Sequence, residues 1–147
     1  MQSYDERLTA PRSWWAVAVL PGASLGLILL PFGPLPLLAG LIGGTALAMA
    51  AVSAYGSARI RVVADSLVAG EARIPVSHLG AAEVLEAEEA VAWRTYKADP
   101  RAFLLLRSYI PTALRVEVDD PADPTPYVYL STRNPKALAE ALATSRG

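Results

Sequence analysis

The chain has 147 residues, of which 53% are apolar and only 18% are charged, and its formal net charge is −1. Soluble domains carry about 25% charged residues, so this composition favours a protein with a membrane-embedded part. The near-neutral charge gives no electrostatic basis for binding nucleic acid, which needs a strongly basic surface. Because the chain has no cysteine, disulfides, thiolate catalysis and zinc–cysteine sites are excluded.

The charges are distributed very unevenly along the chain. The 46 residues between Arg12 and Arg59 include no Asp, Glu, Lys or Arg, whereas nearly all charged residues follow that interval. We therefore expect three parts: an N-terminal cytoplasmic tail (1–13), a membrane segment (14–56) and a water-exposed domain (57–147).

Two apolar runs fill the membrane segment, Trp14–Leu30 with 17 residues and Leu35–Tyr55 with 21. As helices they would measure roughly 25 and 31 Å, against a hydrocarbon core of about 30 Å. The Pro31–Pro34 cluster between them allows only a tight reversal. Since every backbone polar group in lipid needs an internal partner, the runs predict a transmembrane helical hairpin.

Basic residues flank the hairpin at both ends and are missing from its loop. Arg7 and Arg12 precede the first run, and Arg59 and Arg61 follow the second. The positive-inside rule then predicts a multi-pass protein of the plasma membrane with both termini in the cytoplasm.

Two other interpretations of the apolar runs are less favoured. A cleaved signal peptide would have an uninterrupted apolar region and a nearby Ala-x-Ala site, but Pro21–Gly22 interrupts the first run. A transporter or channel usually carries ionisable residues within its spans, and neither run contains one.

Small residues recur at four-residue spacing in both runs, at Gly22, Gly26, Gly40, Gly44 and Ala48. Such ridges let helix backbones approach closely in lipid. They predict either a homo-oligomer interface or, as the more favoured alternative, contact between the two helices of one hairpin.

After Ala58 the sequence changes to short alternating segments separated by turn residues, which predicts about seven strands. We expect them at Ile60–Val63, Leu67–Ala69, Ala72–Val76, Ala81–Leu85, Phe103–Arg107, Ala113–Val118 and Pro126–Ser131. Glu86–Ala90 is expected as a loop or short helical turn, and Val91–Tyr96 is ambiguous between strand and loop.

The apolar pattern also predicts which faces of these elements are buried. The continuous run Phe103–Arg107 suggests a strand buried on both faces or facing the bilayer. In Pro126–Ser131, Val128 and Leu130 share one face, and the intervening tyrosines share the other.

A final helix is predicted from Pro135 to about Ala143, with Asn134 as its N-cap. Leu138 and Leu142 would give this helix one apolar stripe for docking.

This order of strands followed by a helix resembles the pleckstrin-homology-like barrel, whose last helix closes one open end. The segment Ile60–Val63 with Leu67–Ala69, Ile74–Pro75 and the later Leu79 and Val84 is similar to the opening of bacterial domains of that kind. The resemblance implies a small, mainly β barrel with a C-terminal capping helix behind a transmembrane hairpin.

The whole chain also resembles an uncharacterised family of actinobacterial membrane proteins, a domain of unknown function. The segments Tyr4–Leu8, Pro11–Trp15 and Arg94–Phe103 carry that resemblance. It implies the same architecture and no assigned activity.

One stretch combines basic and aromatic side chains: Arg94, Lys97 and Arg101, with Trp93 and Tyr96. Beside a membrane, these basic groups could contact anionic headgroups at about 1 kcal/mol each. The alternative is ordinary pairing with nearby acidic residues. Binding of phosphoinositides through the first hairpin turns is not expected, because those turns are acidic or neutral.

The remaining polar residues give no indication of a metal site. His78 is the only histidine, and the Asp119–Pro124 loop lacks the glycine and the ordered ligand spacing of a calcium loop. No nucleophile with an acid–base partner is recognisable. We therefore expect no enzyme, no cofactor and no small-molecule ligand.

The sequence as a whole favours a membrane-anchored, non-catalytic interaction or scaffolding module at the cytoplasmic face. Its expected partners are the bilayer and either another protein or a second copy of the chain. The alternative is an accessory subunit of a membrane complex, or a module that contacts anionic lipid.

Overall fold

The computed structural model describes residues 2–146 and divides into two compact units. One unit is helical and comprises residues 9–58. The other combines residues 2–8 with residues 59–146, so its two segments are separated in sequence by the whole helical unit.

The helical unit contains α1 (Arg12–Val17), α2 (Val19–Leu29), the 3-10 turn η1 (Leu30–Phe32) and α3 (Pro34–Tyr55). The separation of α1 from α2 at Ala18 fits Pro21, which has no N–H to bond the carbonyl one turn earlier. Gly33, with φ of 114°, makes the reversal into α3.

These helices match the two predicted apolar runs. Within Arg12–Phe32 and Pro34–Tyr55, 18-residue windows reach mean hydropathies of 1.9 and 2.0, and both ranges are long and apolar enough to cross a membrane. At the open end of the hairpin, the rings of Trp14 and Tyr55 stack with centroids 5.7 Å apart.

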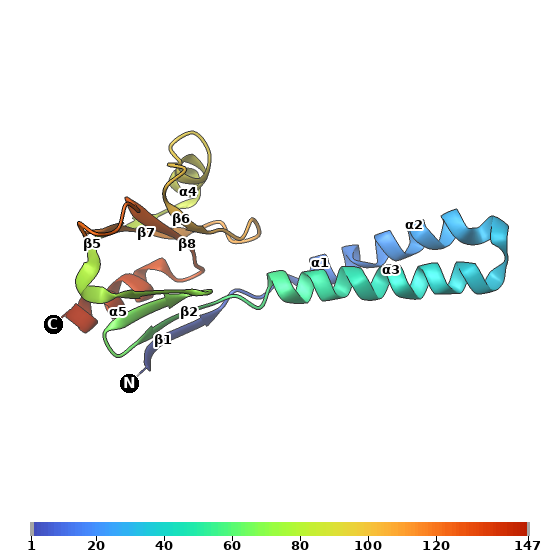
Figure 1. Cartoon of the computed structure of the whole chain (residues 1–147), viewed down its shortest axis with the longest axis horizontal. Helices are drawn as coiled ribbons and strands as arrows, with labels where there is room; N and C mark the ends of the chain where they lie inside the picture. Colours follow the sequence, from blue (N-terminus) through green and yellow to red (C-terminus); the bar gives the residue numbers. More distant parts are fainter. Residues whose placement is uncertain (1, 147) are drawn as a thin grey trace. The chain divides into compact units, whose positions relative to one another are not determined.

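The other unit contains two four-stranded sheets (Figure 1). Sheet A has the order β1-β2-β3-β4 and is antiparallel throughout. Its strands are β1 (Gln2–Arg7), β2 (Arg59–Val63), β3 (Ser66–Ala69) and β4 (Ala72–Pro75). Strand β1 is a difference from the sequence analysis, which assigned these residues to an N-terminal tail.

Sheet B has the order β5-β7-β8-β6, and β6 runs parallel to β8. Its strands are β5 (Leu79–Leu85), β6 (Phe103–Leu105), β7 (Ala113–Val118) and β8 (Tyr127–Ser131), and the turn η2 (Val76–His78) links the two sheets. Among residues 2–146 no strand pairing joins sheet A to sheet B, so the expected barrel is not closed.

The predicted C-terminal helix is confirmed as α5 (Pro135–Arg146). It packs against β1 and β2 of sheet A and against β5 and β7 of sheet B, and Figure 1 shows it between the two sheets. Leu138 and Leu142 are buried as the four-residue spacing predicted. The inner faces of both sheets thus share one core with this helix.

A second, smaller core lies on the outer face of sheet B, under α4 (Ala87–Arg94). The sequence analysis expected a loop or short helical turn at Glu86–Ala90 and a strand or loop at Val91–Tyr96, so the helix through Arg94 is a correction. Its buried residues are the alanines Ala90 and Ala92, which give a weak apolar signal. Because α4 covers this face, all five residues of β8 are buried.

Strand β6 also differs from expectation. It is shorter than predicted and forms an edge of sheet B, where Leu104 is 39% exposed while Leu105 is 7% exposed. Burial on both faces is therefore wrong for this segment. Side chains of one strand alternate between the two faces of a sheet, so the buried Leu105 and the exposed Leu104 lie on opposite faces.

Candidate functional site

The small residues predicted for helix contact lie between α2 and α3. Gly22, Gly26, Gly40 and Gly44 are all buried. A Cβ atom on Gly44 would lie 2.8 Å from the Cα of Gly22, and one on Gly22 would lie 2.6 Å from the carbonyl oxygen of Leu41. These distances are shorter than any ordinary contact, so the backbones meet only because both positions are glycine.

Ala48 continues the same ridge but is only half-buried. It lines a shallow apolar groove on the hairpin with Pro21, Ser24 and Gly44. The glycines are therefore occupied by contact within one hairpin. None of the four glycines is left exposed for contact with a second copy of the chain. A homo-oligomer interface stays a prediction.

Two of the basic residues expected to contact headgroups form ion pairs with acidic residues of their own unit. The Lys97 ammonium lies 3.5 Å from Oε2 of Glu89, and Arg101 bonds Asp99 at 3.1 Å. The Asp99 pKa is lowered by the hydrogen bond from the Arg101 side chain.

Arg94 lies at the end of α4, beside the Tyr129 ring that reaches into the small core. The Tyr129 hydroxyl donates to the Ala90 carbonyl at 3.2 Å, and burial raises the Tyr129 pKa. The Nη1 atom of Arg94 is itself buried. The three cations therefore do not form one open basic surface, which supports the alternative of internal pairing.

The aromatic partner of this stretch, Trp93, contacts Tyr127 edge-on at a centroid distance of 5.3 Å. The guanidinium of Arg115 lies 4.3 Å from the Trp93 ring and also bonds Glu83 at 2.6 Å. These contacts hold α4 on sheet B.

His78 lies 3.4 Å from the Asp120 carboxylate, at the base of the β7–β8 loop. In that loop, Asp120 accepts from Ala122 N and Asp123 accepts from Thr125 N, each at 2.9 Å. The backbone hydrogen bond from Thr125 lowers the Asp123 pKa. Across residues 2–146 no group of three His, Cys, Asp or Glu side chains is placed to hold a metal ion.

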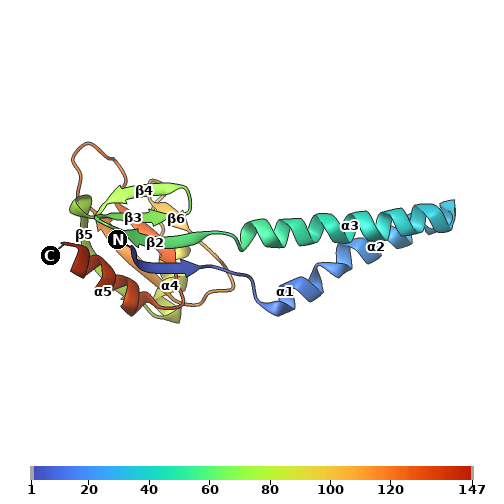
Figure 2. The ribbon, with the colours of Figure 1, turned by 90° about the horizontal axis from the view of Figure 1, so that it is seen from below.

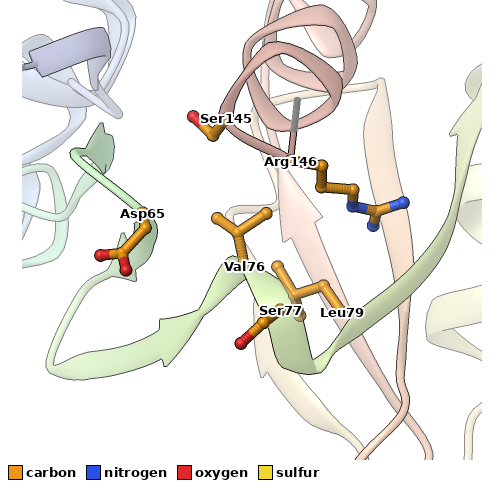
Figure 3. Close-up of a pocket in the computed structure, with 6 residues that line it drawn as sticks. All are labelled: Asp65, Val76, Ser77, Leu79, Ser145 and Arg146. Carbon is orange, nitrogen blue, oxygen red and sulfur yellow. The ribbon is translucent and has the colours of Figure 1, made fainter.

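Figure 3 shows a pocket of about 330 Å³ at the C-terminal end of α5. Val76 and Leu79 form its apolar part, while the Asp65 carboxylate and the Arg146 guanidinium point away from each other. Arg146 instead donates to the Gly80 carbonyl. The polar groups do not converge, so the pocket offers no catalytic or ligand-binding set.

A polar cluster that the sequence analysis did not identify joins β1 to the start of α5. The Glu6 carboxylate accepts from the Thr132 hydroxyl at 3.0 Å and from Arg133 N at 3.2 Å. Tyr4 also donates to Glu6, at 3.1 Å, and its oxygen lies 3.3 Å from Oγ1 of Thr132. Residues about 128 positions apart are thereby tied together.

Burial is the main cause that raises the Tyr4 pKa, to about 12. The Thr132 hydroxyl is itself fully buried and also accepts from Asn134 N at 3.1 Å. All the hydrogen bonds to Glu6 go to Oε1, while its buried Oε2 has no hydrogen-bond partner. The network links β1 to the residues before α5 and fixes their geometry. Tyr4 and Leu8 flank three consecutive charged residues, Asp5, Glu6 and Arg7, so no alternation of apolar and polar residues indicates a strand here.

The comparison with protein families gives one match. A model of the family described as "Protein of unknown function (DUF3093)" matches residues 3–142. Neither a curated protein nor a solved structure matches the chain.

A matched pair of neighbouring glycines tests the helix contact. We expect Gly44→Leu to destabilise the hairpin by about 1–3 kcal/mol, because the added atoms overlap the opposite backbone. A Cβ on Gly43 meets nothing within 4 Å, so Gly43→Leu should be neutral or stabilising. Loss of helical circular dichroism during denaturation in detergent measures both. Equal effects of the two variants would contradict the assigned contact.

The raised pKa of Tyr4 predicts that the free energy of unfolding falls at alkaline pH. Because its folded pKa is raised above the ordinary value of 10.0, Tyr4 stabilises the fold fully below pH 10. That contribution is lost as the pH rises through about 12. We expect Tyr4→Phe to remove this part of the decline, measured by chemical denaturation between those pH values. Tyr96→Phe, at a position that is 82% exposed, is the control and should leave the decline unchanged.

Proposed function

Because the chain belongs to the DUF3093 family, whose description assigns no activity, we propose a function from the geometry: a membrane-anchored, non-catalytic interaction module. The helical hairpin is the anchor, and the two-sheet unit is the part presented in the cytoplasm. The observation that carries this proposal is the pairing of β1 with β2.

Strands β1 and β2 are neighbours in sheet A, and Arg7 is the partner of Arg59. The chain therefore leaves the sheet after Arg7 and returns to the adjacent position at Arg59, with the helical unit in between. If each of its two long apolar segments crosses a bilayer once, exit and return are on the same side. The flanking arginines favour the cytoplasmic side.

The surface of the helical unit supports membrane insertion. Large apolar side chains are exposed along both helices, among them Leu27 at 66%, Leu35 at 78% and Leu47 at 73%. Only 17% and 11% of the 18-residue apolar windows of the two candidate spans are buried within the structure. A continuous apolar surface of this kind is unfavourable in water and favourable in hydrocarbon.

The two-sheet unit offers a surface suited to a protein partner. Within residues 2–8 and 59–146, the exposed large apolar side chains are Val91, Tyr96 and Leu104, all from the α4–β6 segment. Tyrosine is enriched at protein interfaces because its ring buries a large area at little entropic cost. This surface favours the scaffolding role, and an accessory subunit of a membrane complex is the closest alternative.

We also propose that this unit is a relative of the pleckstrin-homology-like domain. The helix α5 supports this view, because it packs on strands of both sheets as a capping helix would. The lipid-contacting role of Arg94, Lys97 and Arg101 stays a second prediction, with less support because the cations of Lys97 and Arg101 have acidic partners.

The topology can be tested with single cysteines, since the chain has none of its own. Phe32→Cys lies in the reversal of the hairpin, and Ala122→Cys lies in the exposed β7–β8 loop. In intact cells, we expect a membrane-impermeant maleimide to label residue 32 and to label residue 122 only after permeabilisation. Labelling of residue 122 in intact cells would contradict the proposed orientation. Protection of both residues until permeabilisation would contradict spanning.

A further inference from the structure

The outer face of sheet A is not covered by any helix or strand of its own unit. Figure 1 shows α5 and sheet B on the opposite side of this sheet, and Figure 2 views the molecule from the uncovered side. Sheet B differs, because α4 covers its outer face.

Four arginines occupy this outer face. In β2 the buried residues Ile60 and Val62 alternate with half-buried Arg59 and Arg61, so the arginines point away from the core. The strand register extends the same face to the other strands. On β1, this face includes Arg7 opposite Arg59 and Asp5 opposite Arg61. On β3 and β4, it includes Val68 opposite Arg61 and Arg73 opposite Val68.

Acidic residues do not balance this charge. On the face itself Asp5 is the one carboxylate from the paired strands, and it is bonded to Arg59, whose Nε lies 3.1 Å from Oδ1. Glu71 is in the exposed β3–β4 turn at the border of the sheet. The whole chain has a net charge of −1, so the residues outside this basic face carry a net negative charge.

This face carries more positive than negative charge, and only Arg59 of its four arginines is paired with a carboxylate in the residues described. Like charges opposite each other on neighbouring strands destabilise a sheet, and Arg7 and Arg59 are such a pair. In addition, the Nε atom of Arg61 is buried and has no hydrogen-bond partner. Among residues 2–146, no ion pair joins Arg7, Arg61 or Arg73 to an acidic side chain. A phosphate group would give the exposed guanidinium groups of Arg7 and Arg73 an acidic partner.

Connectivity limits how far this face can be from the helices. Arg59 follows the last residue of α3, Tyr55, by four positions, and Arg7 precedes the first residue of α1, Arg12, by five. An extended chain covers at most about 3.5 Å per residue, so both arginines stay within roughly 18 Å of a helix end. With the hairpin in a bilayer, that distance reaches the headgroup layer.

We propose that the outer face of sheet A binds phosphate-bearing anionic lipid headgroups through Arg7, Arg59, Arg61 and Arg73. The proposal rests on the membrane anchoring described above and adds a lipid preference to it. Tethering by the hairpin raises the effective concentration of headgroups, so weak individual contacts orient the two-sheet unit. Higher ionic strength weakens the contacts by screening.

The test uses the full-length chain reconstituted in vesicles, with a fluorophore on Val68→Cys in the middle of the face. A spin-labelled headgroup quenches the probe, and vesicles of phosphatidylcholine are compared with and without phosphatidylglycerol. We expect stronger quenching with phosphatidylglycerol. Arg7→Gln with Arg73→Gln should lower the ratio of docked to undocked protein by roughly 25-fold, at about fivefold per arginine.

The matched control is Lys97→Gln with Arg101→Gln, which removes the same charge from the α4–β6 segment and should leave quenching unchanged. Equal quenching in the two lipids would overturn the proposal, as would dependence on Lys97 and Arg101 alone. A probe that responds to polyglutamate but not to phosphatidylglycerol would instead assign the face to an acidic protein, and would also overturn it.

Alkaline carbonate extraction separates this inference from the proposed anchor. A chain that carbonate strips from the vesicles contradicts membrane anchoring. A chain that stays in the vesicles, while the probe at residue 68 shows no dependence on phosphatidylglycerol, contradicts only the lipid-binding face.

Discussion

The pairing of β1 with β2 is the constraint on which the rest of the structure depends. It places residues 2–7 and 59–63 side by side, although a helical unit of 50 residues separates the two segments. The Glu6 carboxylate then ties β1 to Thr132 and Arg133 at the start of α5, and Leu8 is fully buried. Sheet A, the capping helix and the core between the sheets therefore need the residues before the hairpin as much as those after it.

Long insertions into a β-hairpin carry a loop-closure cost that grows slowly with length. Here the inserted unit brings its own ends together. Its helices meet through glycines, and at its open end a Cβ on Gly56 would lie 2.9 Å from Ala10 N. The two antiparallel helices thus place the beginning and the end of the helical unit close together. The pairing of β1 with β2 requires this closeness. This agreement explains how a helical hairpin and a two-sheet unit occupy one chain of 147 residues.

The elements with strong periodic patterns could be predicted from the sequence. The helices α2 and α3 agree with the structure because each follows from a continuous apolar run. The alternation in β7 and the stripe of Leu138 and Leu142 agree because burial of one face determines them. Strand β1 was missed because its partner follows 50 residues of unrelated sequence, and α4 because its buried side chains are alanines. The Tyr4–Glu6–Thr132 cluster and the basic face of sheet A depend on strand register, which no local pattern in one sequence determines.

Replacing residues 9–58 by a short Gly-Ser loop tests the central claim most directly. If β1 belongs to the two-sheet unit, this protein should be soluble, show β-sheet circular dichroism and unfold cooperatively on heating. A fragment that begins at residue 59 lacks Glu6 and the buried Leu8, so it should aggregate or unfold without a cooperative transition. The account would be contradicted if both proteins melted cooperatively at the same temperature, because the residues before the hairpin would then contribute nothing to the fold.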